Sequence, residues 1–279
     1  MNRTGLIVAL SIAVVAGLVF GLYPELDLRA ARYFHAFVDD SRNYFAFRIY
    51  PPMMIARDVG LWIDTLLIAP AVIALIVKLC LPHRKLLVSG RAIVFLMATL
   101  ALGPGLLVNV VLKDHWNRPR PIDVTHFGGK ENFVPWWDPR GNCERNCSFV
   151  SGDVSGAFWT VAPAALAPPQ WRALAYGGAL VLGTAMGAFR VMAGGHFISD
   201  AIFAGVFTFL IVWLVYGWIY RWPRTRLSEE EIDGRLERAG IAIRDALAWI
   251  GYRAGKEIAG PEAGEESDDR FKRRRRGWW

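Results

Sequence analysis

Three short segments of the chain carry charged and polar residues that could bind and cleave a phosphate ester. They are "KDHWNRPRP", "CSFVSGD" and "FRVMAGGHFISD", and their candidate residues are Lys113, Arg118, Arg120, Ser151, Gly152, Asp153, Arg190, His196 and Asp200. Fixed cations neutralise the oxygens of a phosphoryl group, and arginine suits its geometry. A histidine can attack phosphorus while a carboxylate near its second ring nitrogen holds the tautomer. These residue types predict phosphoryl transfer.

The spacing within two of the segments supports this prediction. His196 and Asp200 are four residues apart, so they share a face if a helix begins there. Ser151 and Gly152 precede an apolar run, and a helix starting there would direct backbone N–H groups at an anion. We therefore expect His196 and Asp200 to act as a pair beside an anion site.

Long apolar runs around these segments predict a membrane protein. Hydrophobic residues make up 54% of the 279 residues, and runs of about 18 or more read as membrane spans. The candidate spans are 5–24, 59–81, 92–112, 152–168, 173–192 and 197–220, of which the fourth is short and contains Pro163. The first could instead be a signal peptide, but no small-residue cleavage pattern follows it. The predicted fold class is all-α, a polytopic bundle of six transmembrane helices.

Counting connections brings the three segments to one end of this bundle. The first segment follows the third span and the second precedes the fourth, so both lie in one loop. The third segment returns to the same side after two more crossings. With the N-terminus cytoplasmic, basic residues mark the inner connections, although the outer ones are basic too. The net charge of +7 therefore indicates membrane topology and not a nucleic-acid partner.

The C-terminal part reads as a separate region. We expect a membrane domain at 1–226 and a cytoplasmic region at 227–279. Ser228 and Glu231 form a capping-box pattern before an amphipathic helix. The terminal "FKRRRRGWW" suits anionic headgroups, or is an exposed tail.

The three motifs in this order and spacing resemble the type 2 phosphatidic acid phosphatase (PAP2) superfamily. Its membrane branch includes lipid A, undecaprenyl pyrophosphate and phosphatidylglycerophosphate phosphatases of bacteria. The motif positions are Lys113, Arg120 with Pro121, Ser151 with Gly152, Arg190, His196 and Asp200. The resemblance implies a metal-independent lipid phosphatase without a cofactor, in the bacterial inner membrane with its site facing the periplasm.

The resemblance also assigns roles within the site. Lys113, Arg120 and Arg190 would bind phosphate, and Ser151 and Gly152 would add hydrogen bonds. His196 would form a phosphohistidine, with Asp200 as its partner. Lipid A is the first choice of substrate. The other two lipid phosphates, transfer to a second lipid, and a transporter or scaffold without turnover stay open, as does the oligomeric state.

Two positions depart from the family pattern. Phe189 stands where a serine is usual, and Asp153 stands where a histidine protonates the leaving group. An aspartate with an ordinary pKa of about 3.9 would need a rise of about three units to act as an acid at neutrality. We expect such a tuned acid. The alternatives are that His115 or His126 replaces it, that the leaving group needs little help, or that the enzyme is inactive.

Other residues of the outer segments have two interpretations each. Cys143 and Cys147 could form a disulfide or, with further ligands, hold a metal. Arg118 could contact phosphate or lie on the surface. The aromatic loop 122–147 could be a membrane belt or a lid over a large anionic headgroup, and we expect His35 at the membrane interface.

Overall fold

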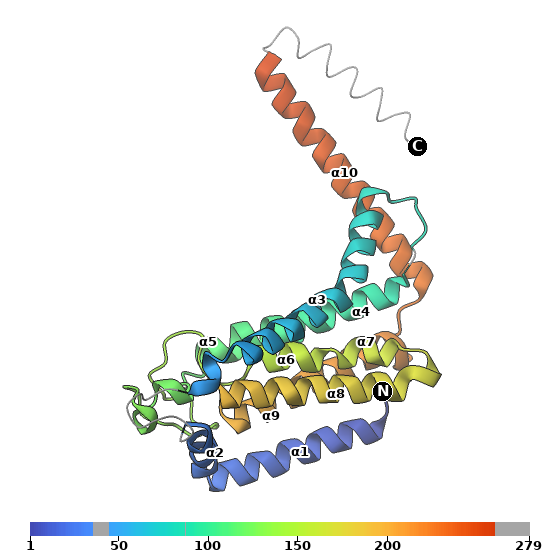
Figure 1. Ribbon diagram of the computed structural model, residues 1–279. Helices are drawn as coiled ribbons and strands as arrows, with labels where there is room; N and C mark the ends of the chain where they lie inside the picture. The colour runs from blue at the N-terminus through green and yellow to red at the C-terminus, as the bar shows by residue number, and fades with distance from the viewer. Residues whose placement is uncertain (36–44, 87, 260–279) are drawn as a thin grey trace. The chain divides into compact units, whose positions relative to one another are not determined.

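The computed structural model describes residues 1–35, 45–86 and 88–259, which form helices and no β-strand (Figure 1). The predicted all-α class is confirmed for these residues. The chain divides into two compact units. The first comprises Met1–Ala71 and Arg91–Leu227, and the second comprises Val72–Gly90 and Ser228–Trp279.

Five helices in the described part are long and apolar enough to cross a membrane. Three of them are single elements: α1 (Arg3–Leu22), α3 (Pro51–Cys80) and α8 (Pro169–Met192). A fourth is continuous from α4 (Gly90–Leu100) through η2 (Ala101–Leu112) to α5 (Lys113–His115). The fifth is α9 (Ile198–Tyr216) with η5 (Gly217–Arg221). The side chain of Asn2 begins α1 by accepting from the amide of Gly5 at 3.0 Å. A multi-pass membrane protein is therefore the plain interpretation of these helices.

The predicted span 152–168 is divided into two short helices, α6 (Gly152–Trp159) and α7 (Val161–Leu166). Pro163 has no N–H to donate to the carbonyl of Trp159, so the helix is weakened there. The hydroxyl of Thr160 donates to the carbonyl of Ala157 at 2.6 Å. Neither helix crosses a membrane by itself, so the structure does not confirm the count of six.

The core of the first unit lies where α6 packs against both α8 and α9, and α1 packs on the same α9. Above it, aromatic rings from the loop and from α9 form one cluster. Phe149 stacks between Trp116 and Trp136, and Trp136 also contacts Phe203, at centroid distances of 4.4 to 6.1 Å. This cluster fixes the loop that carries the second motif.

The outer segments pack onto this end of the helices. The connection between the third and fourth predicted spans contains a Cys143–Cys147 disulfide, which confirms that interpretation over a metal site. It also contains η3 (Pro121–Asp123) and η4 (Thr125–Phe127). Preceding α3 are α2 (Glu25–His35) and η1 (Ala46–Arg48), which flank residues outside the described part of the chain. The ring of His35 packs against Phe127, 5.2 Å between centroids.

The loop 122–147 uses most of its aromatic residues for packing. Phe127 is buried with Val124 and Phe197, and Trp136 belongs to the cluster described above, whereas Trp137 is half exposed. These contacts assign Phe127 and Trp136 to packing within the protein, and the belt and lid interpretations both stay predictions.

The second unit contains α10 (Glu229–Ala259). The predicted capping box is present, because Ser228 and Glu231 exchange amide-to-side-chain hydrogen bonds of 3.1 Å. Buried Lys78 forms a 2.9 Å ion pair with Asp233 of α10. The basic segment 271–279 lies outside the described residues.

Candidate active site

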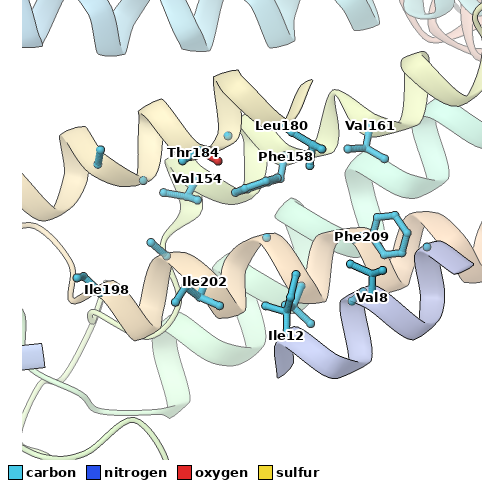
Figure 2. A pocket seen from close by; sticks show the side chains of 18 of the residues that line it. Val8, Ile12, Val154, Phe158, Val161, Leu180, Thr184, Ile198, Ile202 and Phe209 are labelled. Atoms are coloured by element: carbon cyan, nitrogen blue, oxygen red, sulfur yellow. The ribbon is translucent and has the colours of Figure 1, made fainter. Parts of the chain in front are cut away.

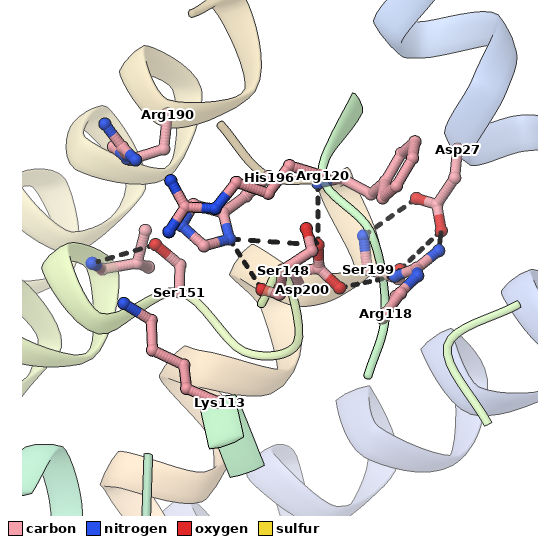
Figure 3. Close-up of polar contacts among 12 residues, drawn as sticks. Asp27, Lys113, Arg118, Arg120, Ser148, Ser151, Arg190, His196, Ser199 and Asp200 are labelled. Atoms are coloured by element: carbon pink, nitrogen blue, oxygen red, sulfur yellow. Dashed lines mark hydrogen bonds and ion pairs between the residues drawn. The ribbon is translucent and has the colours of Figure 1, made fainter. Parts of the chain in front are cut away.

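His196 lies in the short connection between α8 and α9, and its ring is buried (Figure 3). Its Nδ1 is 2.7 Å from the backbone carbonyl oxygen of Ser148. A carbonyl only accepts, so Nδ1 carries the hydrogen and the lone pair is on Nε2. This is the tautomer that a nucleophilic histidine needs. The turn beside it requires glycine at position 194, where φ is +64°, a left-handed conformation that L side chains rarely adopt.

Asp200 lies in the first turn of α9 and is fully buried. Its Oδ2 accepts from the hydroxyl of Ser148 at 2.5 Å and from the amide of Phe197 at 2.8 Å. The same oxygen is 4.0 Å from His196 Nδ1, which is too long for a hydrogen bond. Asp200 therefore acts on the ring through Ser148, whose carbonyl makes the direct contact. The sequence pattern indicated the pair but not this intermediary.

Three cations gather around the His196 ring, as the motifs predicted (Figure 3). Lys113 Nζ donates to the side chain of Asn146 at 3.1 Å, and Arg120 Nη2 donates to its backbone carbonyl at 2.7 Å. Burial lowers the pKa of His196 well below 6.5, and Arg190, Arg120 and Lys113 lower it further. The imidazole is therefore neutral at pH 7. The positive charges around it would attract an anion.

Ser151 and Gly152 begin α6 beside these cations. A helix begins at "VSGD" as predicted, and the Ser151 hydroxyl caps it by accepting from the amide of Val154 at 3.5 Å. A Cβ on Gly152 would lie 2.7 Å from Asn109 Oδ1 and 3.2 Å from Lys113 Nζ. A larger residue at position 152 would therefore have to displace the ends of the Asn109 and Lys113 side chains.

Asp153, on the next position of α6, contacts two guanidinium groups. Arg57 Nε on α3 is 2.7 Å from its Oδ2, and Arg190 Nε is 3.3 Å from the same oxygen. Two cations at this range stabilise the ionised carboxylate. In this arrangement Asp153 bridges Arg57 and Arg190 and has no proton to give.

Arg118 is fully buried behind the site and contacts no solvent. Its guanidinium donates to Asp200 Oδ1 at 2.5 Å, to Asp27 Oδ2 at 2.8 Å and to the hydroxyl of Ser199 at 2.9 Å. Both interpretations from the sequence, phosphate contact or surface position, are wrong. Arg118 instead connects Asp27 of α2 to Asp200, the carboxylate next to the His196 ring.

Comparison with known proteins places these residues in a family. The PAP2 superfamily profile matches residues 92–224. A lipid A 4'-phosphatase of Francisella tularensis subsp. novicida is 35% identical over 228 residues, 79% of this chain and 98% of that protein. A lipid A 4'-phosphatase of Rhizobium leguminosarum is 40% identical over 106 residues, 38% of this chain and 46% of that protein. This chain belongs to the PAP2 superfamily.

A solved structure shares the fold of this PAP2 protein. The transmembrane PAP2-type phosphatidylglycerolphosphate phosphatase from Bacillus subtilis is 18% identical, with a TM-score of 0.50 over 81% of this chain and 100% of that chain. Together with the relatives, the family membership establishes that this protein is a phosphatase, a hydrolase of phosphoric esters.

The positions of His115 and His126 bear on which residue could replace the histidine that PAP2 proteins usually have at the position of Asp153. His115 is exposed, with Nδ1 3.1 Å from the carbonyls of Val110 and Val111. His126 is also exposed, and its ring packs against Phe127 and Phe133. These contacts direct neither ring at His196, whereas Asp153 adjoins Arg57 and Arg190.

Besides Ser148, Arg57 and Asp27 contribute to this PAP2 site and were missed in the sequence. Arg57 had a signal, since a charged residue within an apolar helix usually faces a polar partner. Asp27 had none, because its position in an amphipathic outer helix gives no hint of a partner 91 residues away.

Proposed function

We propose that this PAP2 phosphatase removes a phosphate from lipid A through a phosphohistidine at His196. The observation that carries the proposal is the hydrogen bond from Nδ1 to the Ser148 carbonyl, which leaves the Nε2 lone pair available beside Lys113, Arg120 and Arg190. The relatives are named for lipid A, and their name makes the 4'-phosphate the first candidate.

The reaction has two displacements. His196 Nε2 attacks phosphorus, a P–N bond forms, and the P–O bond to the sugar breaks while the three cations stabilise the equatorial oxygens. Water then attacks phosphorus and gives a proton to the carboxylate that served as the acid in the first step, the P–N bond breaks, and inorganic phosphate leaves. Throughout, Nδ1–H stays bonded to Ser148 and stabilises the positive charge on the ring.

The proton for the leaving sugar oxygen comes from Asp153 in this proposal. A bound phosphate competes for Arg190 and Arg57, so the carboxylate loses the two ion pairs that keep it ionised. The phosphate also brings negative charge beside it. Both changes favour the protonated acid, and both arise only when substrate is bound.

The topology completes the proposal. α6 and α7 pack along α8, so together they return over its length and make the sixth crossing. The N-terminus and α10 are then cytoplasmic, and the site faces the periplasm from the bacterial inner membrane. The basic residues near the ends of α8 and α9 away from His196, Arg172 and Arg221, agree with this orientation.

Mass spectrometry of lipid A treated with purified protein tests the function. We expect loss of one phosphate, with fragmentation assigning it to the 4' position, and acid-labile phosphate trapped on the parent but not on His196→Asn. Higher kcat/KM for phosphatidylglycerophosphate or undecaprenyl pyrophosphate would replace lipid A as substrate. Labelled phosphate recovered on a second lipid would identify a phosphotransferase.

A further inference from the structure

An apolar cleft runs between α8 and α1, with α6 and α9 forming its floor (Figure 2). Its volume is about 690 Å³. Polar side chains among the residues lining it are few, and none carries a charge; they are Asn2, Thr4 and Thr184. The walls include exposed Val8 and Ile12 of α1 and Leu180 of α8. A water-soluble ligand would find almost nothing to bind here.

Glycines give the cleft its depth. A Cβ on Gly183 of α8 would lie 2.6 Å from the ring of Phe158, and one on Gly205 of α9 would lie 2.9 Å from the same ring. The two glycines therefore let the Phe158 ring lie between the helices as a flat floor (Figure 2). Along α8, the small residues Gly187 and Ala188 continue the lining of the cleft toward the active site.

The cleft and the active site share one end of the bundle. Val154, Val191 and Ile198 line the cleft, and they are one or two residues from Asp153, Arg190 and His196. On α9 the lining runs from Ile198 to Phe209, and eleven residues of helix rise roughly 16 Å. That is about half of the ~30 Å hydrocarbon core, the depth of one leaflet.

We infer that this cleft holds one hydrocarbon chain of the lipid substrate whose phosphate lies against His196. The inference rests on the proposed function. Its support is the continuity of an uncharged, chain-like cleft with a site for a charged headgroup. A chain leaving bilayer hydrocarbon for this cleft gains little from the hydrophobic effect, because lipid is equally apolar. The cleft therefore serves to fix the phosphate at the nucleophile, not to increase the partition of lipid onto the protein.

Filling the cleft tests the inference. Thr184→Phe places a ring in the cleft, and Val8→Trp does so from the opposite wall. Val181→Phe is the matched control, because Val181 is on the same helix, is exposed and does not line the cleft. Each variant is assayed on lipid A in mixed micelles and on p-nitrophenyl phosphate, which has no chain.

We expect Thr184→Phe and Val8→Trp to lower kcat/KM for lipid A roughly tenfold through lost positioning of the phosphate. Activity on p-nitrophenyl phosphate should stay within twofold of the parent, and Val181→Phe should match the parent on both. If both filled variants cleave lipid A like the control, no substrate chain lies in the cleft and any occupant is a bilayer lipid. Equal loss on both substrates would also overturn the inference, because the headgroup site itself would be changed. A parent inactive on lipid A but active on p-nitrophenyl phosphate would instead overturn the proposed function, and with it a lipid A chain in the cleft.

Discussion

Arg118 and Asp200 form a completely buried ion pair behind the His196 ring, with Nη1 and Oδ1 2.5 Å apart. The second terminal nitrogen of the guanidinium, Nη2, binds Asp27 of α2, which also accepts from the amide of Ser199 at 3.0 Å. Because Asp200 accepts from the Ser148 hydroxyl, and the Ser148 carbonyl binds His196 Nδ1, one chain of contacts runs from α2 to the ring that we propose as the nucleophile. The order of the site thus depends on a helix outside all three motifs.

Replacing Arg118 should destabilise the protein more than replacing an exposed arginine does. Arg118→Met leaves Asp27 and Asp200 as buried carboxylates without their cation, which typically costs about 3–5 kcal/mol. We expect a large fall in the midpoint of thermal unfolding in detergent. Arg140→Ala is the control, because the Arg140 side chain is 79% exposed and the loss of its pair with Asp138 should lower the midpoint far less. Equal midpoints for both variants would contradict this account.

Part of this arrangement could be predicted from sequence. Counting apolar runs placed Lys113, Arg190 and His196 at one end of the bundle, because span order needs only hydropathy. The contact of Arg118 with Asp27 could not be found this way, since helical periodicity reports neighbours three or four residues apart. The division of 152–168 was missed because averaged hydropathy ignores the hydrogen bond that Pro163 cannot donate.

The rate should persist at acidic pH because burial and nearby cations hold the pKa of His196 well below 6.5. Only neutral imidazole attacks phosphorus, so lowering this pKa moves the acid limb of kcat/KM to lower pH. At pH 6 a histidine with an ordinary pKa of 6.5 would be about three-quarters protonated. We expect no such loss between pH 7 and pH 6 in the pH–rate profile.

Arg120→Gln provides the comparison for this profile. Arg120 is one of the cations that lower the pKa of His196, so its removal should move the acid limb to higher pH. The substrate's own titration is common to both proteins and cancels in the comparison. An acid limb at the same pH in parent and variant would show that Arg120 does not act on the imidazole.

Asp200→Asn should slow the reaction less than loss of a carboxylate that contacts its histidine directly. That loss costs ~10⁴ in kcat in the serine-protease triad. Here the ring is held by the Ser148 carbonyl, and Asp200 is 4.0 Å away. We expect a fall of roughly 10- to 100-fold, because the indirect contact only orders Ser148.

Ser148→Ala tests whether Asp200 acts on the His196 ring through Ser148. It removes the hydroxyl that Asp200 binds at 2.5 Å but keeps the carbonyl. If Asp200 acts through Ser148, the double variant should be little slower than Asp200→Asn alone, and single-turnover kcat measures this. Fully additive losses would mean that Asp200 reaches the ring by another path.

Asp153→Asn tests whether Asp153 donates a proton or only bridges Arg57 and Arg190. As an acid, Asp153 should contribute about 10²–10⁴ to kcat on lipid A, whose sugar oxygen is a poor leaving group, and little on p-nitrophenyl phosphate, whose leaving group needs no proton. As a bridge alone, it should affect both substrates equally through Arg57 and Arg190.

Asp153→His should retain activity on lipid A with a shifted pH optimum, because an imidazole also donates a proton. Asp58→Asn is the matched control, because Asp58 is an exposed carboxylate that also pairs with Arg57, at 3.5 Å, and its loss therefore tests an ionic contact alone. A lipid A rate unchanged in Asp153→Asn would remove the acid role, since the leaving group would then depart without a proton from this carboxyl.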